Sequence, residues 1–93
     1  MIFIDTAQGV FELYFIRDKE KRKVDFLIVK EKSPLILIDC KSSEKEPEKN
    51  LRYFHDLLKV ERSFQLIDDP DYHKSYRDGI TVMGYEKFFS GWV

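Results

Sequence analysis

Three apolar runs of strand length follow one another in the first half of the chain, at residues 11–17, 23–30 and 35–41, and polar residues interrupt the first two. Alternation with a period of two is typical of β-strands, and the connections between these runs are short and rich in charge or contain proline. Pro34 suits the first position of the third strand, where a missing backbone donor matters least. The pattern therefore predicts a meander of three antiparallel strands.

The hydrophobic period changes to that of a helix in the middle of the chain. Leu51, Phe54 and Leu58 recur at the spacing of one helix face, and Pro47 fits the first turn of such a helix. His55 lies beside this apolar stripe, and we interpret it as a boundary histidine without a ligand role. A helix that follows three meander strands is expected to return the chain to the same sheet.

Shorter segments complete the pattern at both ends of the chain. Residues 63–67 and 80–83 are predicted strands, residues 72–79 a basic and aromatic loop, and residues 86–89 a single helical turn. Residues 1–10 are predicted to form a tail or an edge segment that ends in a turn. Together these elements predict an α+β fold with a mixed sheet and a helix on one face, as a single domain over all 93 residues.

Composition narrows the classes of protein to which the chain can belong. Charged residues are 35% and hydrophobic residues 43%, and the formal net charge of -1 gives no overall basic bias for nucleic acid. The single cysteine excludes an internal disulfide, so a reducing, cytoplasmic setting is expected. No apolar run approaches the roughly 18 residues of a membrane span, and we expect no contact with a membrane.

Two of the predicted strands carry acidic residues where a buried strand normally carries none. Asp25 lies within an apolar run, and Asp39 ends another, with Lys41 two residues later. Because side chains on a strand alternate between faces, Asp39 and Lys41 are expected to point the same way. A carboxylate among apolar residues costs several kcal/mol unless it is paired or binds a metal. These three residues are therefore the first candidates for function.

Carboxylates on paired strands, followed by a lysine, match the requirements of phosphodiester hydrolysis. Such carboxylates can converge on a hard divalent cation, which polarises a phosphate and lowers the pKa of an attacking water. A lysine on the same face can stabilise the charge that develops on the phosphate or position the water. The same side chains are equally consistent with a buried salt-bridge network that binds no metal.

This arrangement resembles the PD-(D/E)XK nuclease superfamily, which has a restriction-endonuclease-like fold. Asp25 matches the first acid of that motif, and Asp39-Cys40-Lys41 matches its (D/E)-x-K part, while Val24 replaces the proline. A closer resemblance is to the C-terminal domain of bacterial and archaeal AAA-type ATPases. It rests on the runs Leu13-Tyr14-Phe15-Ile16-Arg17-Asp18, Lys23-Val24-Asp25-Phe26 and Ile38-Asp39-Cys40-Lys41-Ser42-Ser43, and it extends over about residues 11–90.

The resemblance implies a restriction-endonuclease-like core, DNA as substrate and Mg²⁺ or Mn²⁺ as cofactor. Asp25, Asp39 and the carbonyl of Cys40 would be metal ligands, Lys41 would act on the water or the phosphate, and Glu12 is a further candidate acid. The N-terminal helix with which the superfamily begins is missing from the predicted elements. Either the chain is a piece of a longer ATPase-type protein, or a partner fills the place of that helix.

A second hypothesis is a non-catalytic module that associates with itself or docks on a protein partner. It is based on the aromatic content of 15% and on the apolar residues near both ends of the chain. DNA binding without cleavage is a third hypothesis, but the net charge and the acidic turn at residues 68–71 argue against it.

Overall fold

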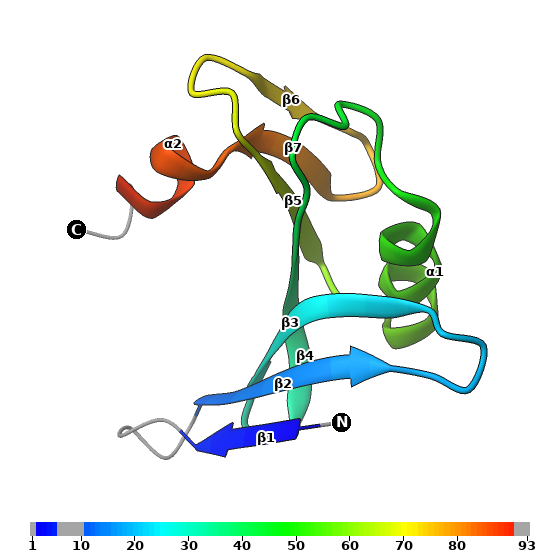
Figure 1. Ribbon diagram of the computed structural model, residues 1–93. Helices are drawn as coiled ribbons and strands as arrows, with labels where there is room; N and C mark the ends of the chain where they lie inside the picture. The colour runs from blue at the N-terminus through cyan, green and yellow to red at the C-terminus, as the bar shows by residue number, and fades with distance from the viewer. Residues whose placement is uncertain (1, 6–10, 91–93) are drawn as a thin grey trace.

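The computed structural model describes residues 2–5 and 11–90, with the side chains of residues 11–90 (Figure 1). The described strands form one seven-stranded mixed sheet, in the order β1-β2-β3-β4-β5-β7-β6, with helices on both of its faces. The elements in chain order are β1 (Ile2–Asp5), β2 (Phe11–Arg17), β3 (Lys23–Lys30), β4 (Ser33–Cys40), α1 (Lys49–Leu58), β5 (Arg62–Ile67), β6 (His73–Ser75), β7 (Ile80–Gly84) and α2 (Tyr85–Ser90). The predicted α+β class with a mixed sheet is confirmed.

The sheet has an antiparallel half and a mostly parallel half, which meet at β4. Strands β1 to β4 are paired antiparallel, β4, β5 and β7 are parallel, and β6 is antiparallel to β7 at the far edge. Helix α1 is the crossover between the parallel strands β4 and β5 and packs on one face, whereas α2 packs on β5 and β7 from the other (Figure 1). The predicted sequence of meander, helix and return strand is therefore present.

Each face of the sheet has its own apolar core. Leu37 of β4 is fully buried in the core beneath α1, together with Leu51 and Phe54 of that helix. The next residue, Ile38, points the other way and packs in a second cluster with Phe88 of α2. Alternation along one strand therefore supplies both cores, which is why β4 reads as a nearly continuous apolar run.

The start of α1 differs from the prediction. The helix begins at Lys49, and Glu48 is its N-cap, so Pro47 precedes the cap and does not occupy the first helical turn. The side chain of Glu48 accepts a hydrogen bond from the backbone N–H of Asn50 at 2.7 Å. This side-chain acceptor satisfies one of the open donors at the helix start, and the helix begins two residues later than a proline at its first position would imply.

Two strand assignments also differ. β4 begins at Ser33, and Pro34 is its second residue, where the pairing with β3 shifts register. Residues 72–79, predicted as a loop, contain the edge strand β6, because the tight turn at Tyr76–Gly79 brings His73–Ser75 beside β7. The exposed polar side chains of β6 gave no alternating apolar signal.

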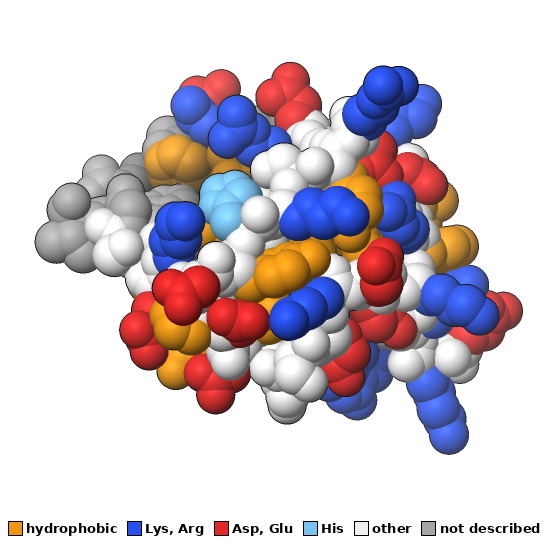
Figure 2. All heavy atoms as spheres, turned by 90° about the horizontal axis from the view of Figure 1, so that it is seen from above, with side chains coloured by type: hydrophobic (Ala, Val, Ile, Leu, Met, Phe, Trp, Pro, Cys, Tyr) orange, Lys and Arg blue, Asp and Glu red, His pale blue; other side chains and the backbone are white. Residues whose placement is uncertain are grey.

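The N-terminal segment is an edge strand over Ile2–Asp5, one of the two alternatives predicted for it. The turn predicted at residues 6–9 and the apolar chain end at residues 91–93 lie outside the described residues. Among the helices that the structure describes, none is long and apolar enough to span a bilayer. At the β6 end of the molecule, Lys and Arg side chains are interspersed with acidic and apolar ones (Figure 2), so this end has no surface of a single charge.

Candidate functional site

The candidate site lies where β3 and β4 stop pairing through their backbones. The last register pair on this side is Phe26 with Ile38. On the other side of β3, the pairing with β2 moves from Tyr14–Leu27 to Ile16–Val24, so β3 contains one extra residue at this point. An extra residue of this kind is a β-bulge, which bends a strand and re-aims its side chains. The bulge contains Asp25.

Reciprocal hydrogen bonds connect the carboxylates of Asp25 and Asp39 to the opposite strand. The backbone N–H of Asp25 donates to Oδ1 of Asp39 at 3.3 Å, and the backbone N–H of Cys40 donates to Oδ2 of Asp25 at 2.9 Å. Beyond the last backbone pair of β3 and β4, these carboxylate oxygens therefore accept the hydrogen bonds that backbone carbonyls would accept in a regular sheet. One oxygen of each carboxylate is used in this way, and the other is not committed to strand pairing.

Asp39 is the most constrained charged group of the site. It is only 1% exposed, and its Oδ2 lies 3.3 Å from Nζ of Lys41 but accepts no well-aligned hydrogen bond. Burial raises the pKa of Asp39, the charge of Asp25 raises it further, and the ion pair with Lys41 offsets only part of this effect. Burial of a carboxylate oxygen without an aligned donor is costly, and the ion pair with Lys41 offsets part of this cost.

Lys41 completes the cluster on the same face as Asp39, as the alternation predicted. Its backbone N–H donates to the carbonyl of Leu66 at 2.8 Å, which anchors it to β5 just beyond the end of β4. Burial lowers the pKa of Lys41, but the nearby carboxylates of Asp39, Glu48 and Asp25 outweigh this effect, so the pKa is raised overall. Lys41 is therefore an ammonium donor at neutral pH.

The structure brings together the side chains of Asp25, Asp39 and Lys41. Cys40 lies between them in sequence, but partial burial, followed by the charges of Asp25 and Asp39, raises the pKa of its thiol, so a thiolate ligand is not expected. Within residues 11–90, no group of three or more His, Cys, Asp and Glu side chains is placed to hold a metal ion. A cation here would therefore be held by two carboxylates and backbone oxygen.

Glu12 lies away from this cluster. It pairs in register with Val29, near the end of β3 opposite to Asp25. Its carboxylate accepts a hydrogen bond of 2.5 Å from the hydroxyl of Tyr14, and this bond raises the pKa of that hydroxyl. Glu12 is therefore engaged locally on β2 and is not a third acid of the site.

Gln65 supports the site and was not singled out from the sequence. It is fully buried on β5, in register with Asp39. Its side-chain amide forms hydrogen bonds with the backbone of the segment that connects β4 to α1. Its Nε2 donates to the carbonyls of Glu44 and Glu46 at 2.6 and 2.9 Å, and its Oε1 accepts from the N–H of Glu48 at 2.8 Å. A polar residue in the apolar run of residues 63–67 was the available signal.

His55 has a structural environment that differs from a boundary position. It is 5% exposed, with Nδ1 at 2.6 Å from the hydroxyl of Ser63 and Nε2 at 2.6 Å from the carbonyl of Asp78. Because a carbonyl only accepts, Nε2 donates to the carbonyl of Asp78, and Nδ1 shares a hydrogen bond with the Ser63 hydroxyl. Ser63 is fully buried, so this pair fastens α1 to β5 and does not present a nucleophile.

Comparison with known proteins identifies a family over most of the chain. The family model described as Domain of unknown function (DUF4143) matches residues 4–88, which include every residue of the candidate site. No curated protein and no solved structure matches the chain significantly.

Proposed function

The chain belongs to the DUF4143 family, a domain of unknown function, and we propose that it hydrolyses phosphodiester bonds of DNA at a PD-(D/E)XK-like, Mg²⁺-dependent site. The observation that carries the proposal is the buried Asp39 carboxylate, whose Oδ2 lacks an aligned hydrogen bond beside Asp25 and Lys41. The resemblance of the sequence runs around these residues to the C-terminal domain of AAA-type ATPases supports the same interpretation.

The residues fit a hard divalent cation in their chemistry. Asp25 and Asp39 each offer a carboxylate oxygen that is not used in strand pairing. The carbonyl of Cys40, the residue after Asp39, is a third oxygen donor. Oxygen donors of this kind suit Mg²⁺ and Mn²⁺. When bound, such a cation would polarise the scissile phosphate and favour ionisation of a water nucleophile.

Lys41 has a separate role in this proposal. Its raised pKa keeps it protonated at neutral pH, so it donates hydrogen bonds and does not act as a general base. An ammonium group beside the carboxylates stabilises negative charge as it develops on the phosphate oxygens. Gln65 donates hydrogen bonds to the carbonyls of Glu44 and Glu46, in the segment that follows Lys41.

Cleavage assays with matched variants test this proposal. Purified protein should cut plasmid or single-stranded DNA in the presence of Mg²⁺ or Mn²⁺, and Lys41→Ala should reduce the rate by about a hundredfold or more. Lys49→Ala, which removes an exposed lysine at the start of α1, should retain the activity. Absence of cleavage of every DNA form by folded protein would contradict the hydrolytic role.

A binding measurement separates metal binding from activity. Mg²⁺ or Mn²⁺ should raise the melting temperature of the wild-type protein, because a ligand that binds only the folded state stabilises it. Asp39→Asn should abolish this increase, whereas Asp56→Asn, on the exposed side of α1, should preserve it. An equal increase in both variants would mean that the cations bind elsewhere.

A second candidate function is self-association as a non-catalytic module. It is favoured by apolar side chains of β3 and β4 on the face of the sheet that carries α2. Phe26 is 41% exposed, and Ile28 and Ile36 are half-buried at the margin of the core under α2. Helix α1 covers the opposite face, and α2 packs on β5 and β7. Two copies that pair these faces would remove the exposed apolar surface from water.

Sedimentation velocity tests the second function. We expect a dimer at high protein concentration that Phe26→Asp converts to monomer, because a buried carboxylate would oppose pairing of the faces. Leu57→Asp is the matched control, since Leu57 is 57% exposed on α1, on the other side of the sheet. A strictly monomeric wild-type protein would exclude this module.

A further inference from the structure

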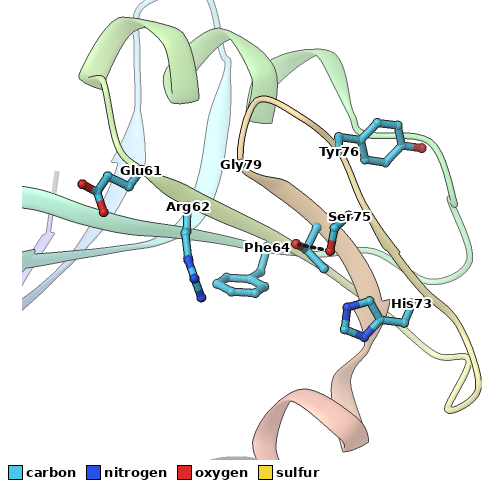
Figure 3. Close-up of a pocket in the computed structure, with 8 residues that line it drawn as sticks. Glu61, Arg62, Phe64, His73, Ser75, Tyr76 and Gly79 are labelled. Carbon is cyan, nitrogen blue, oxygen red and sulfur yellow. Dashed lines mark hydrogen bonds between the residues drawn. The ribbon is translucent and has the colours of Figure 1, made fainter.

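A pocket of about 350 Å³ lies on the face of the sheet that carries α2, away from the acidic cluster. It spans β5, β7 and the edge strand β6, and Figure 3 shows Arg62, Phe64 and His73 among the residues that line it. This volume is within the range of about 300–1,000 Å³ that is typical of small-ligand sites. No residue of the candidate hydrolytic site lines it.

The middle of the pocket combines a flat ring with hydroxyl groups. Phe64, Thr81 and Ser75 are level with one another across the three strands. The hydroxyls of Ser75 and Thr81 are 3.2 Å apart, so one donates to the other and a further donor remains for a ligand. Phe64 packs on Phe88 with ring centroids 4.9 Å apart, which holds the Phe64 ring in place.

The pocket has basic side chains at opposite corners. Arg62 precedes Phe64 by two residues on β5. His73 is two residues from Ser75 on β6, level with Met83, on the opposite side of the row that Phe64, Thr81 and Ser75 form. The two residues are therefore about 13 Å apart along the strand direction, at about 3.3 Å per residue. In the described part of the chain, the guanidinium of Arg62 has no ion-pair or hydrogen-bond partner, and the side chain is exposed.

We propose that this pocket binds one nucleotide, with its base on the Phe64 ring and its phosphate on the guanidinium of Arg62. Arginine presents paired donors that match a phosphate, and aromatic rings accept any base by stacking. The hydroxyl pair and the imidazole of His73 are placed to hydrogen-bond the sugar or the polar edge of the base. Glu61 also lines the pocket, but its carboxylate points away from Phe64 (Figure 3).

The nucleotide can be a free mononucleotide or one unit of a single strand, because both present the same base and phosphate. The proposal does not depend on hydrolysis, since Asp39 and Lys41 face α1 and the pocket faces α2. The Asp39→Asn variant should accordingly bind nucleotides as the wild-type protein does, so failure of one proposal leaves the other open to its own test.

Chemical-shift mapping with amide NMR tests the pocket. Titration with AMP or CMP should shift amide signals of β5, β6 and β7 saturably, whereas adenosine and inorganic phosphate should each bind more weakly than the nucleotide. A short oligothymidylate distinguishes the sources: tighter binding per site than TMP assigns the pocket to a strand, and equal binding assigns it to free nucleotides.

Matched variants complete the test. Arg62→Ala should weaken AMP binding about tenfold or more, as expected for loss of a charge-assisted hydrogen bond, and Phe64→Leu should weaken it by a similar factor through loss of stacking. Arg77→Ala removes an exposed arginine that does not line the pocket and should leave binding unchanged. Unsaturable shifts, equal binding of phosphate and AMP, or wild-type affinity in Arg62→Ala would each overturn the proposal.

Discussion

At the scale of single residues, the ionised Asp39 carboxylate works against stability. Its pKa is raised mainly by burial and further by the charge of Asp25, despite the ion pair with Lys41. A carboxyl group whose pKa is higher in the folded state binds its proton more tightly there. The folded state is therefore favoured at acid pH, and this advantage is lost as the pH rises from the usual Asp range through the raised pKa.

We predict that Asp39→Asn has a higher free energy of unfolding than the wild-type protein at pH 7, because the amide has no charge to bury. The difference should be smaller at pH 4, because the raised pKa of Asp39 favours its protonation in the wild-type protein as the pH falls. Urea denaturation followed by circular dichroism at both pH values measures it. Asp56→Asn, which changes an exposed acid of α1, should show no such difference. A less stable Asp39→Asn at pH 7 would mean that the Lys41 ion pair outweighs burial.

A second residue-scale prediction concerns Gln65, which connects β5 to the segment before α1 by three hydrogen bonds. Gln65→Leu keeps the side-chain volume but leaves the N–H of Glu48 and the carbonyls of Glu44 and Glu46 without these partners. We expect a loss of about 2–4 kcal/mol in the free energy of unfolding, measured in urea. Ser75→Ala, which removes a hydroxyl from an exposed edge strand, should cost less than about 0.5 kcal/mol.

The sequence identified the acids and the lysine of the site but not the groups that support them. Asp25 and Asp39 stood out because carboxylates are rare within apolar runs. Gln65 did not, because its partners lie 17 to 21 residues away along the chain. The buried environment of His55 was missed for the same reason, since its partners lie 8 and 23 residues away. Such contacts depend on how the helix crosses the sheet, which a periodic pattern does not specify.

At the scale of elements, the hairpin between β3 and β4 contains an unfavourable turn. Glu31 and Lys32 connect the strands with φ values of 50° and 68°, a left-handed conformation that costs a residue with a side chain about 1 kcal/mol. Positive φ at both central residues favours Asn-Gly. We predict that replacing Glu31 and Lys32 by Asn and Gly raises the free energy of unfolding by about 1 kcal/mol, as thermal denaturation would show.

A charge-only control separates this backbone effect from electrostatics. Replacing both residues by glutamine removes the same charges but keeps the strained backbone, so the stability should stay within about 0.5 kcal/mol of the wild-type value. An equal gain in the glutamine variant would assign the effect to charge and contradict the argument from φ.

Elements with a strong apolar period were predictable, and those defined by hydrogen bonding were not. The apolar runs of β2, β3 and β4 and the helical period of α1 each indicate buried residues, so the order and type of these elements followed from the sequence. Strand β6 has three exposed residues, and only its pairing with β7 makes it a strand. The N-cap at Glu48 and the bulge at Asp25 likewise depend on partners outside their own segments.

At the scale of the whole molecule, β4 is where the two halves of the sheet meet. It pairs antiparallel with β3 and parallel with β5, and its alternate residues enter the cores of both faces. The candidate site follows directly from this position, because Asp39 and Lys41 stand at the carboxyl end of a parallel strand, beside the crossover to α1. In open sheets, ligands commonly bind at such ends.

The same position predicts how stability is distributed. Strands β4 and β5 are paired on both sides, α1 packs on both of them, and α2 packs on β5, so their amides should open only with global unfolding. The edge strand β6 is paired on one side and exposed, so its amides should exchange by local opening. Amide hydrogen exchange followed by NMR should therefore be slowest in β4 and β5. Exchange in β6 as slow as in β4 would show that the sheet unfolds as one cooperative unit up to this edge.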